Sequence, residues 1–185
     1  MKPRTDDVTA HLHSPANTDV RTARVLVAGQ FALIGILVVL PGRHDGPVPV
    51  ALTAACAVAT VVGLAVMVIS TTALGRGLTA TPLPNAHAQL RTGGLYRFVR
   101  HPIYSGLLLT MASITVAFGS GSRLLTLVVL LLLLTLKARW EETRLAQRFG
   151  GYASYAARTP RFLPVRLRRQ SSVRLASKSV GGGPP

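Results

Sequence analysis

Acidic residues and cysteine are both scarce in this chain of 185 residues. Six aspartates and glutamates stand against 21 lysines and arginines. Cys56 is the only cysteine and lies inside an apolar run, which excludes a disulfide framework and a cysteine metal site. Four of the five histidines are scattered through polar segments without ligand spacing or acidic partners, so we predict no metal ion.

Apolar residues, in contrast, make up 49% of the chain and gather in four long runs. A transmembrane helix needs about 17–25 such residues. We therefore predict an all-α bundle that crosses the membrane about four times, with spans at about 25–41, 48–70, 103–119 and 124–140. Only a short Gly-Ser turn with Arg123 separates the last two spans, which predicts a helical hairpin.

The remaining segments frame a single membrane domain at residues 25–165. Residues 1–24 are polar and lack the apolar core of a signal peptide. Residues 166–185 are rich in Ser, Arg, Gly and Pro and are predicted to form a disordered basic tail. After the fourth span, an apolar-aromatic stripe at residues 145–155 predicts a C-terminal interfacial amphipathic helix, broken or bent at Gly150 and Gly151.

Lysines and arginines are distributed unevenly between the two sides of the predicted spans. Nineteen of the 21 fall on one side, and only Arg43 and Arg123 fall on the other. The positive-inside rule then places both termini in the cytoplasm. Topology and attraction of the basic tail to anionic lipid explain the net charge of +15, so we do not predict nucleic-acid binding. Frequent Ala, Leu, Val and Arg favour a bacterial source with a GC-rich genome. We therefore predict that the protein lies in a bacterial cytoplasmic membrane.

The densest polar motif, residues 93–106, opens the third span. Pro102 suits the first helical position, where a missing N–H costs nothing, and His101 would then be the cap. The free backbone N–H groups of residues 103–105 would point toward the side chains of Arg97, Arg100 and His101. Because a helix N-terminus is electropositive, this arrangement predicts an anion-binding site at the membrane surface.

Glu141 and Glu142 are the only glutamates and stand where the last span leaves the membrane. One interpretation is a charge pair on a solvated helix face, salt-bridged to Arg139, Arg144 or Arg148. The other is that one carboxylate faces a cavity and binds a cationic or hydroxyl-bearing ligand, since charged groups near spans are often functional. His101 and Tyr104 share a helix face and are either a cap and an interfacial tyrosine or parts of the same site.

Together these regions resemble the isoprenylcysteine carboxyl methyltransferase family, which is related in architecture to the membrane phospholipid methyltransferases. The family's Gly-x-Tyr-Arg-x-x-Arg-His-Pro-x-Tyr-x-Gly run matches residues 94–106. Its two adjacent glutamates match Glu141 and Glu142, and its closing Arg-Phe-x-Pro matches residues 161–164. The match covers the C-terminal half, and it pairs two separated motifs in the same order.

The resemblance implies S-adenosylmethionine as the methyl donor, bound at the cytoplasmic face. By position, His101 and Tyr104 look like cofactor-site residues, and Arg100 and Pro102 shape the start of their helix. Glu141 and Glu142 look like the acidic pair that serves the cofactor and the substrate. We therefore assign catalytic roles to Glu141, Glu142 and Arg100.

The charges of this cofactor suit the same residues. Its carboxylate fits the positive helix end with Arg97, Arg100 or His101, and its ammonium fits a glutamate such as Glu142. Its sulfonium fits against Tyr96 or Tyr104 by a cation–π contact. The short Gly75-Arg76-Gly77 run is similar to the Gly-x-Gly that phospholipid methyltransferases use toward the cofactor.

The predicted function is methyl transfer from S-adenosylmethionine to a lipophilic acceptor that arrives from the bilayer. This acceptor is the carboxylate or amine of an isoprenoid- or lipid-like substrate, either a small molecule or a lipidated one. A first alternative is an NADPH-dependent enzyme like the membrane sterol reductases, which share the C-terminal architecture. A second is a non-catalytic membrane protein whose basic tail binds anionic lipid.

Overall fold

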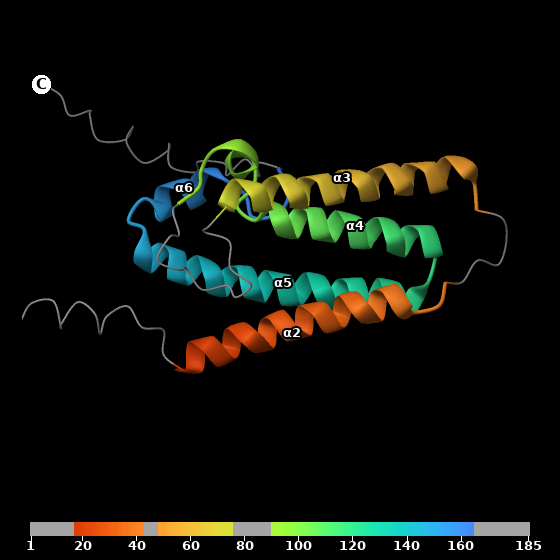
Figure 1. Ribbon diagram of the computed structural model, residues 1–185, viewed down its shortest axis with the longest axis horizontal. Helices are drawn as coiled ribbons and strands as arrows, with labels where there is room; N and C mark the ends of the chain where they lie inside the picture. The colour runs from red at the N-terminus through yellow and green to blue at the C-terminus, as the bar shows by residue number, and fades with distance from the viewer. Residues whose placement is uncertain (1–16, 43–47, 76–89, 165–185) are drawn as a thin grey trace, which may run out of the picture.

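The computed structural model describes residues 17–42, 48–75 and 90–164, and these residues are helical apart from short connections (Figure 1). They contain no strand, which confirms the predicted all-α class. The helices are α2 (Asn17–Val39), α3 (Val50–Leu74), α4 (Pro102–Phe118), α5 (Gly121–Arg148) and α6 (Tyr152–Arg158), with a 3-10 turn η2 (Gly94–Arg97) before α4.

Several predictions concern residues outside the described ranges. They are the basic tail at 166–185, most of the polar segment at 1–24, the Arg76-Gly77 part of the glycine motif and the four scattered histidines.

Three helices, α2, α3 and α5, are long and apolar enough to cross a membrane. The first begins at Asn17 and ends at Val39, whereas the sequence predicts a span at about 25–41. The fourth predicted span continues as a helix to Arg148. Helix α4 is apolar but has only 17 residues, which is the lower limit of about 17 for a span. The count of four spans therefore stays a prediction.

The helices form two antiparallel pairs, α3 with α4 and α2 with α5, and α4 also packs against α5 (Figure 1). Gly119 ends α4 in the left-handed conformation, with φ 54° and ψ 40°, where glycine has no Cβ to clash. Helix α5 starts at Gly121, so the predicted hairpin turn is confirmed. The buried core between the helices consists of Leu37, Tyr104, Leu107, Met111, Leu130, Leu134 and Ala138.

Helices α3 and α4 cross most closely where Gly63 faces Gly106. A Cβ atom built on Gly106 would lie 2.6 Å from the carbonyl oxygen of Gly63 and 2.8 Å from Cγ of Met67. A Cβ atom on Gly63 would lie 2.7 Å from the carbonyl oxygen of Gly106. Small residues allow such close approach between helices in membranes. This crossing sets the position of α4, and hence of the polar motif at its start.

Arg123 closes the end of the bundle remote from α6. Its side chain is only 3% exposed, and its Nη2 donates hydrogen bonds to the carbonyl oxygens of Val38 and Leu40, where α2 ends. The guanidinium carbon lies 4.3 Å from the centroid of the Phe118 ring. A cation at a helix C-terminus satisfies carbonyls that have no intrahelical donor. Arg123 therefore fastens the end of α2 to the α4–α5 hairpin.

Replacing Arg123 by Met should lower the free energy of unfolding by about 1–3 kcal/mol, because buried carbonyls lose their donor. Thermal unfolding of the detergent-purified protein, followed by circular dichroism, measures this change. Arg139→Met is the matched control, since it removes an exposed arginine from the same helix. Equal melting temperatures for the two variants would show that the Arg123 contacts do not stabilise the fold.

Candidate functional site

The start of α4 has the predicted geometry at its first two positions. His101 is the N-cap residue and Pro102 is the first helical residue. The His101 side chain makes no capping hydrogen bond, so its ring is available to other partners. One expectation is wrong: the backbone N–H of Ser105 is not free for a ligand, because it donates to the carbonyl oxygen of His101 at 3.0 Å.

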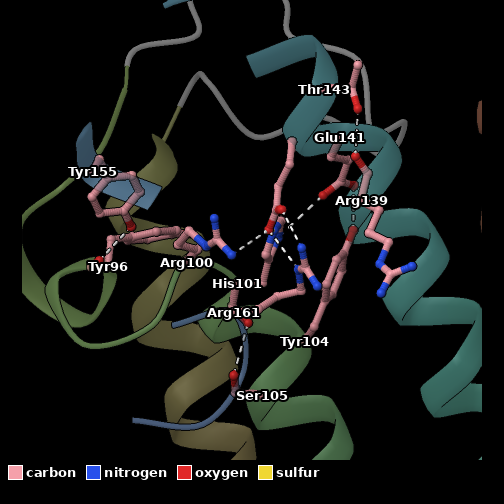
Figure 2. A network of polar contacts seen from close by, with 11 residues as sticks. Tyr96, Arg100, His101, Tyr104, Ser105, Arg139, Glu141, Thr143, Tyr155 and Arg161 are labelled. Atoms are coloured by element: carbon pink, nitrogen blue, oxygen red, sulfur yellow. Dashed lines mark hydrogen bonds and ion pairs between the residues drawn. The ribbon is translucent and has the colours of Figure 1, made fainter. Parts of the chain in front are cut away.

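His101 lies between the two glutamates of α5. Figure 2 shows it together with Glu141, Arg100 and Arg161. Its Nε2 is 3.0 Å from Oε1 of Glu142, and its Nδ1 is 3.5 Å from Oε2 of Glu141. The three side chains are 9%, 12% and 15% exposed for His101, Glu142 and Glu141. Two motifs distant in sequence thus meet in one largely buried cluster, and the interpretation of the glutamates as a solvated charge pair is wrong.

Glu142 is surrounded by cationic side chains. Arg161 binds it in a bidentate manner, with Nε 2.9 Å from Oε1 and Nη2 2.7 Å from Oε2. Arg100 Nη2 lies 3.4 Å from Oε1. The hydrogen bonds to Glu142 raise the pKa of the Arg161 guanidinium, which therefore stays charged. Sequence reasoning considered Arg139, Arg144 and Arg148 as partners and missed Arg161.

Glu141 has a different environment. Its Oε1 accepts a hydrogen bond of 2.5 Å from the Tyr104 hydroxyl. The Tyr104 ring is parallel to that of His101, with centroids 5.3 Å apart and an interplanar angle of 2°. No arginine makes an ion pair with Glu141 in the described part of the chain. The two adjacent carboxylates therefore differ: guanidinium groups bind one, and a hydroxyl and an imidazole contact the other.

A segment after α6, residues 159–164, ties the cluster together, and we call it the C-terminal strap. The backbone N–H of Arg100 donates to the carbonyl oxygen of Pro160 at 2.9 Å, and that of His101 to Arg161 at 3.1 Å. The Ser105 hydroxyl donates to the carbonyl oxygen of Phe162 at 2.6 Å. The strap therefore brings Arg161 to Glu142 and holds the start of α4 in place. The Arg-Phe-x-Pro motif was the available sequence signal for this segment.

Tyr96 and Arg97, which the sequence also places at the site, lie at its edge. The Tyr96 hydroxyl donates to the carbonyl oxygen of Ser70 at 3.4 Å, and its own carbonyl accepts from Tyr155 at 2.6 Å (Figure 2). Burial raises the pKa of the Tyr155 phenol to about 12, so this donor keeps its proton at neutral pH. Arg97 is exposed, and its guanidinium carbon lies 5.1 Å from the centroid of the Phe98 ring. Cofactor contacts for these two residues stay predictions.

Two buried donors near the cluster have no hydrogen-bond partner among the described residues: Nε of Arg100 and the hydroxyl of Tyr152. Buried polar groups in proteins are nearly always paired, so unpaired donors beside a charged cluster favour a polar ligand. A guanidinium N–H suits a ligand carboxylate, and the Glu141 carboxylate suits an ammonium or a hydroxyl. The residues present therefore fit S-adenosylmethionine, which carries all three groups.

The chain matches a known protein family. The model of a family described as phospholipid methyltransferase matches residues 51–151, more than half of the chain. The matched range includes α4 and both glutamates, whereas α2 and the C-terminal strap lie outside it. No curated protein and no solved structure matches the chain.

Proposed function

Since the chain belongs to the phospholipid methyltransferase family, and is therefore a membrane methyltransferase, we propose that it transfers a methyl group from S-adenosylmethionine to a lipophilic acceptor at the cytoplasmic membrane face. The observation that carries this proposal is the position of His101 between Glu141 and Glu142, which joins the two motifs in one buried site. S-adenosylmethionine is the methyl donor that the family generally uses.

The distribution of charge supports the cytoplasmic position. Within the described ranges, Arg123 is the only lysine or arginine at the end of the bundle remote from α6. All others lie toward the end that carries the cluster. By the positive-inside rule, that end faces the cytoplasm, and so do both termini.

When bound, the cofactor would supply a methyl group on a sulfonium: an acceptor lone pair would bond to the methyl carbon in line with the carbon–sulfur bond, which would break and leave its electron pair on the neutral thioether. The protein's tasks are then alignment of the reactants and exclusion of water. We assign Arg100 and the start of α4 to the cofactor carboxylate. Glu142 orients Arg100, His101 and Arg161 around the cofactor, and Glu141 takes the cofactor ammonium or ribose hydroxyls.

The acceptor determines whether a base is needed. A carboxylate attacks with its own electron pair and releases no proton. An amine must lose a proton, and Glu141 or His101 is placed to accept it. The acceptor is in both cases a lipid-like molecule from the bilayer, and the exposed basic residues favour anionic lipid around the protein.

Equilibrium binding of S-adenosylmethionine to the detergent-purified protein, with NADPH in parallel, tests the proposal. We expect saturable binding of S-adenosylmethionine alone. His101→Ala should weaken it by at least about tenfold, or ~1.4 kcal/mol, because the contacts of the imidazole with both glutamates are lost. Arg158→Ala, an exposed arginine on α6, is the control.

The other outcomes identify the alternatives. Binding of NADPH alone would support an enzyme like the membrane sterol reductases. Binding of neither compound to folded protein would support the non-catalytic, lipid-binding alternative.

A further inference from the structure

Helix α2 lies outside the matched range, yet it contributes a side chain next to the site. Lys137 of α5 is only 5% exposed, and its Nζ donates a hydrogen bond of 2.7 Å to Oε1 of Gln30 on α2. The same Nζ lies 5.0 Å from the centroid of the Tyr104 ring. Lys137 thus contacts the tyrosine whose hydroxyl binds Glu141.

The partner of Lys137 is unexpected. Lys137 and Glu141 are four residues apart on α5, which is the spacing at which opposite charges on a helix pair. A buried ammonium is costly unless it is paired, and a carboxylate is a stronger acceptor than an amide. Yet among the ion pairs of the described residues none joins Lys137 to Glu141, and the ammonium binds the neutral Gln30 instead.

We propose that Gln30 is a positioning residue of the site: it holds the Lys137 ammonium away from Glu141, so that this carboxylate remains available for the cationic group of the ligand. The inference rests on the proposed function. Through Gln30, α2 would contribute to ligand binding at the methyltransferase site, although α2 carries none of the family's motifs. Ionisable side chains at membrane depth, such as Lys137, commonly mark functional sites.

A purely structural role for Gln30 is the competing explanation, and the chain offers a matched control for it. Asp19 of α2 forms an ion pair with Arg144 of α5, whose guanidinium also lies over the Trp140 ring. This second polar contact joins the same two helices but involves neither Tyr104 nor Glu141. Asp19→Asn should therefore lower the melting temperature without changing the affinity for S-adenosylmethionine.

The test measures the dissociation constant of S-adenosylmethionine in the full-length, detergent-purified protein. Gln30→Met should weaken binding by about tenfold, because the released ammonium turns to Glu141 and occupies it. Gln30→Asn keeps the amide but withdraws it by one methylene, and it should give a smaller loss. Adding Lys137→Met to Gln30→Met removes the competing ammonium and should restore most of the affinity.

The melting temperatures of the same variants separate the two explanations, since deleting both halves of a buried polar contact can also restore stability. A structural role would lower affinity no more than Asp19→Asn does at an equal loss of melting temperature, whereas the proposed role lowers it further. The inference is overturned if Gln30→Met and Gln30→Asn bind like the wild type, or if the double variant is as weak as Gln30→Met alone. Failure of the wild-type protein itself to bind S-adenosylmethionine would instead overturn the proposed function.

Discussion

Replacing Glu142 by Gln should weaken S-adenosylmethionine binding by about 100-fold, or ~2.7 kcal/mol, while the helices and membrane insertion remain. The Glu142 carboxylate accepts hydrogen bonds from Arg161 and His101 and forms an ion pair with Arg100. Removing one partner of a buried ion pair typically costs ~3–5 kcal/mol, because the remaining charges are left uncompensated. The strap would lose its bidentate contact with α5, and the start of α4 would lose the contacts of Arg100 and His101 with the carboxylate.

Equilibrium binding measures this effect, and far-UV circular dichroism checks that the helices persist. Arg161→Lys is the graded comparison: it keeps the positive charge but cannot form the two parallel hydrogen bonds of a guanidinium. We expect its affinity to fall between those of the wild type and Glu142→Gln. Unchanged affinity in both Glu142→Gln and His101→Ala would remove the site assignment.

Gly106→Ala should be among the most destabilising substitutions in the chain, at about 3 kcal/mol, the upper part of the usual cost of overpacking. The added Cβ would lie 2.6 Å from the backbone oxygen of Gly63. Backbone atoms cannot move aside as a flexible side chain can, so α3 and α4 must separate. Because α4 carries His101 and Tyr104, cofactor binding should fall together with stability.

Thermal unfolding in detergent tests this prediction, with Gly35→Ala as the control. Gly35 lies in α2, and a Cβ atom there would meet no neighbour within 4 Å. That substitution should be neutral or stabilising, since alanine favours a helix over glycine by up to ~1 kcal/mol. If Gly106→Ala unfolds at the wild-type temperature, the close crossing of α3 and α4 is not present in the protein.

The helices could be predicted because long apolar runs have few alternatives at membrane depth. The start of α2 could not, because residues 17–24 are polar and read as part of an N-terminal segment. In the folded chain Asp19 forms an ion pair with Arg144 of α5. A charged residue that the sequence assigns to a polar segment before the helix therefore lies inside it. Local composition contains no information about such a contact.

The candidate site was predicted in part. The residues of both motifs were selected correctly as neighbours, since the structure brings together Arg100, His101, Tyr104, Glu141 and Glu142. Their individual partners were not predicted. Arg161 was missed because nothing in the spacing of residues 142 and 161 places them together until α6 and the strap reverse the chain.

The sequence by itself determined the helical class and the residues of the two motifs, because hydrophobicity and residue type are local properties. Only the tertiary structure decided which carboxylate meets which cation. The strap gives Arg161 to Glu142, and α2 gives Gln30 to Lys137, which leaves Glu141 with the Tyr104 hydroxyl and the His101 imidazole. Ion pairs form only between charges a few ångströms apart. Which carboxylate pairs with which cation therefore depends on how distant segments of the chain pack together.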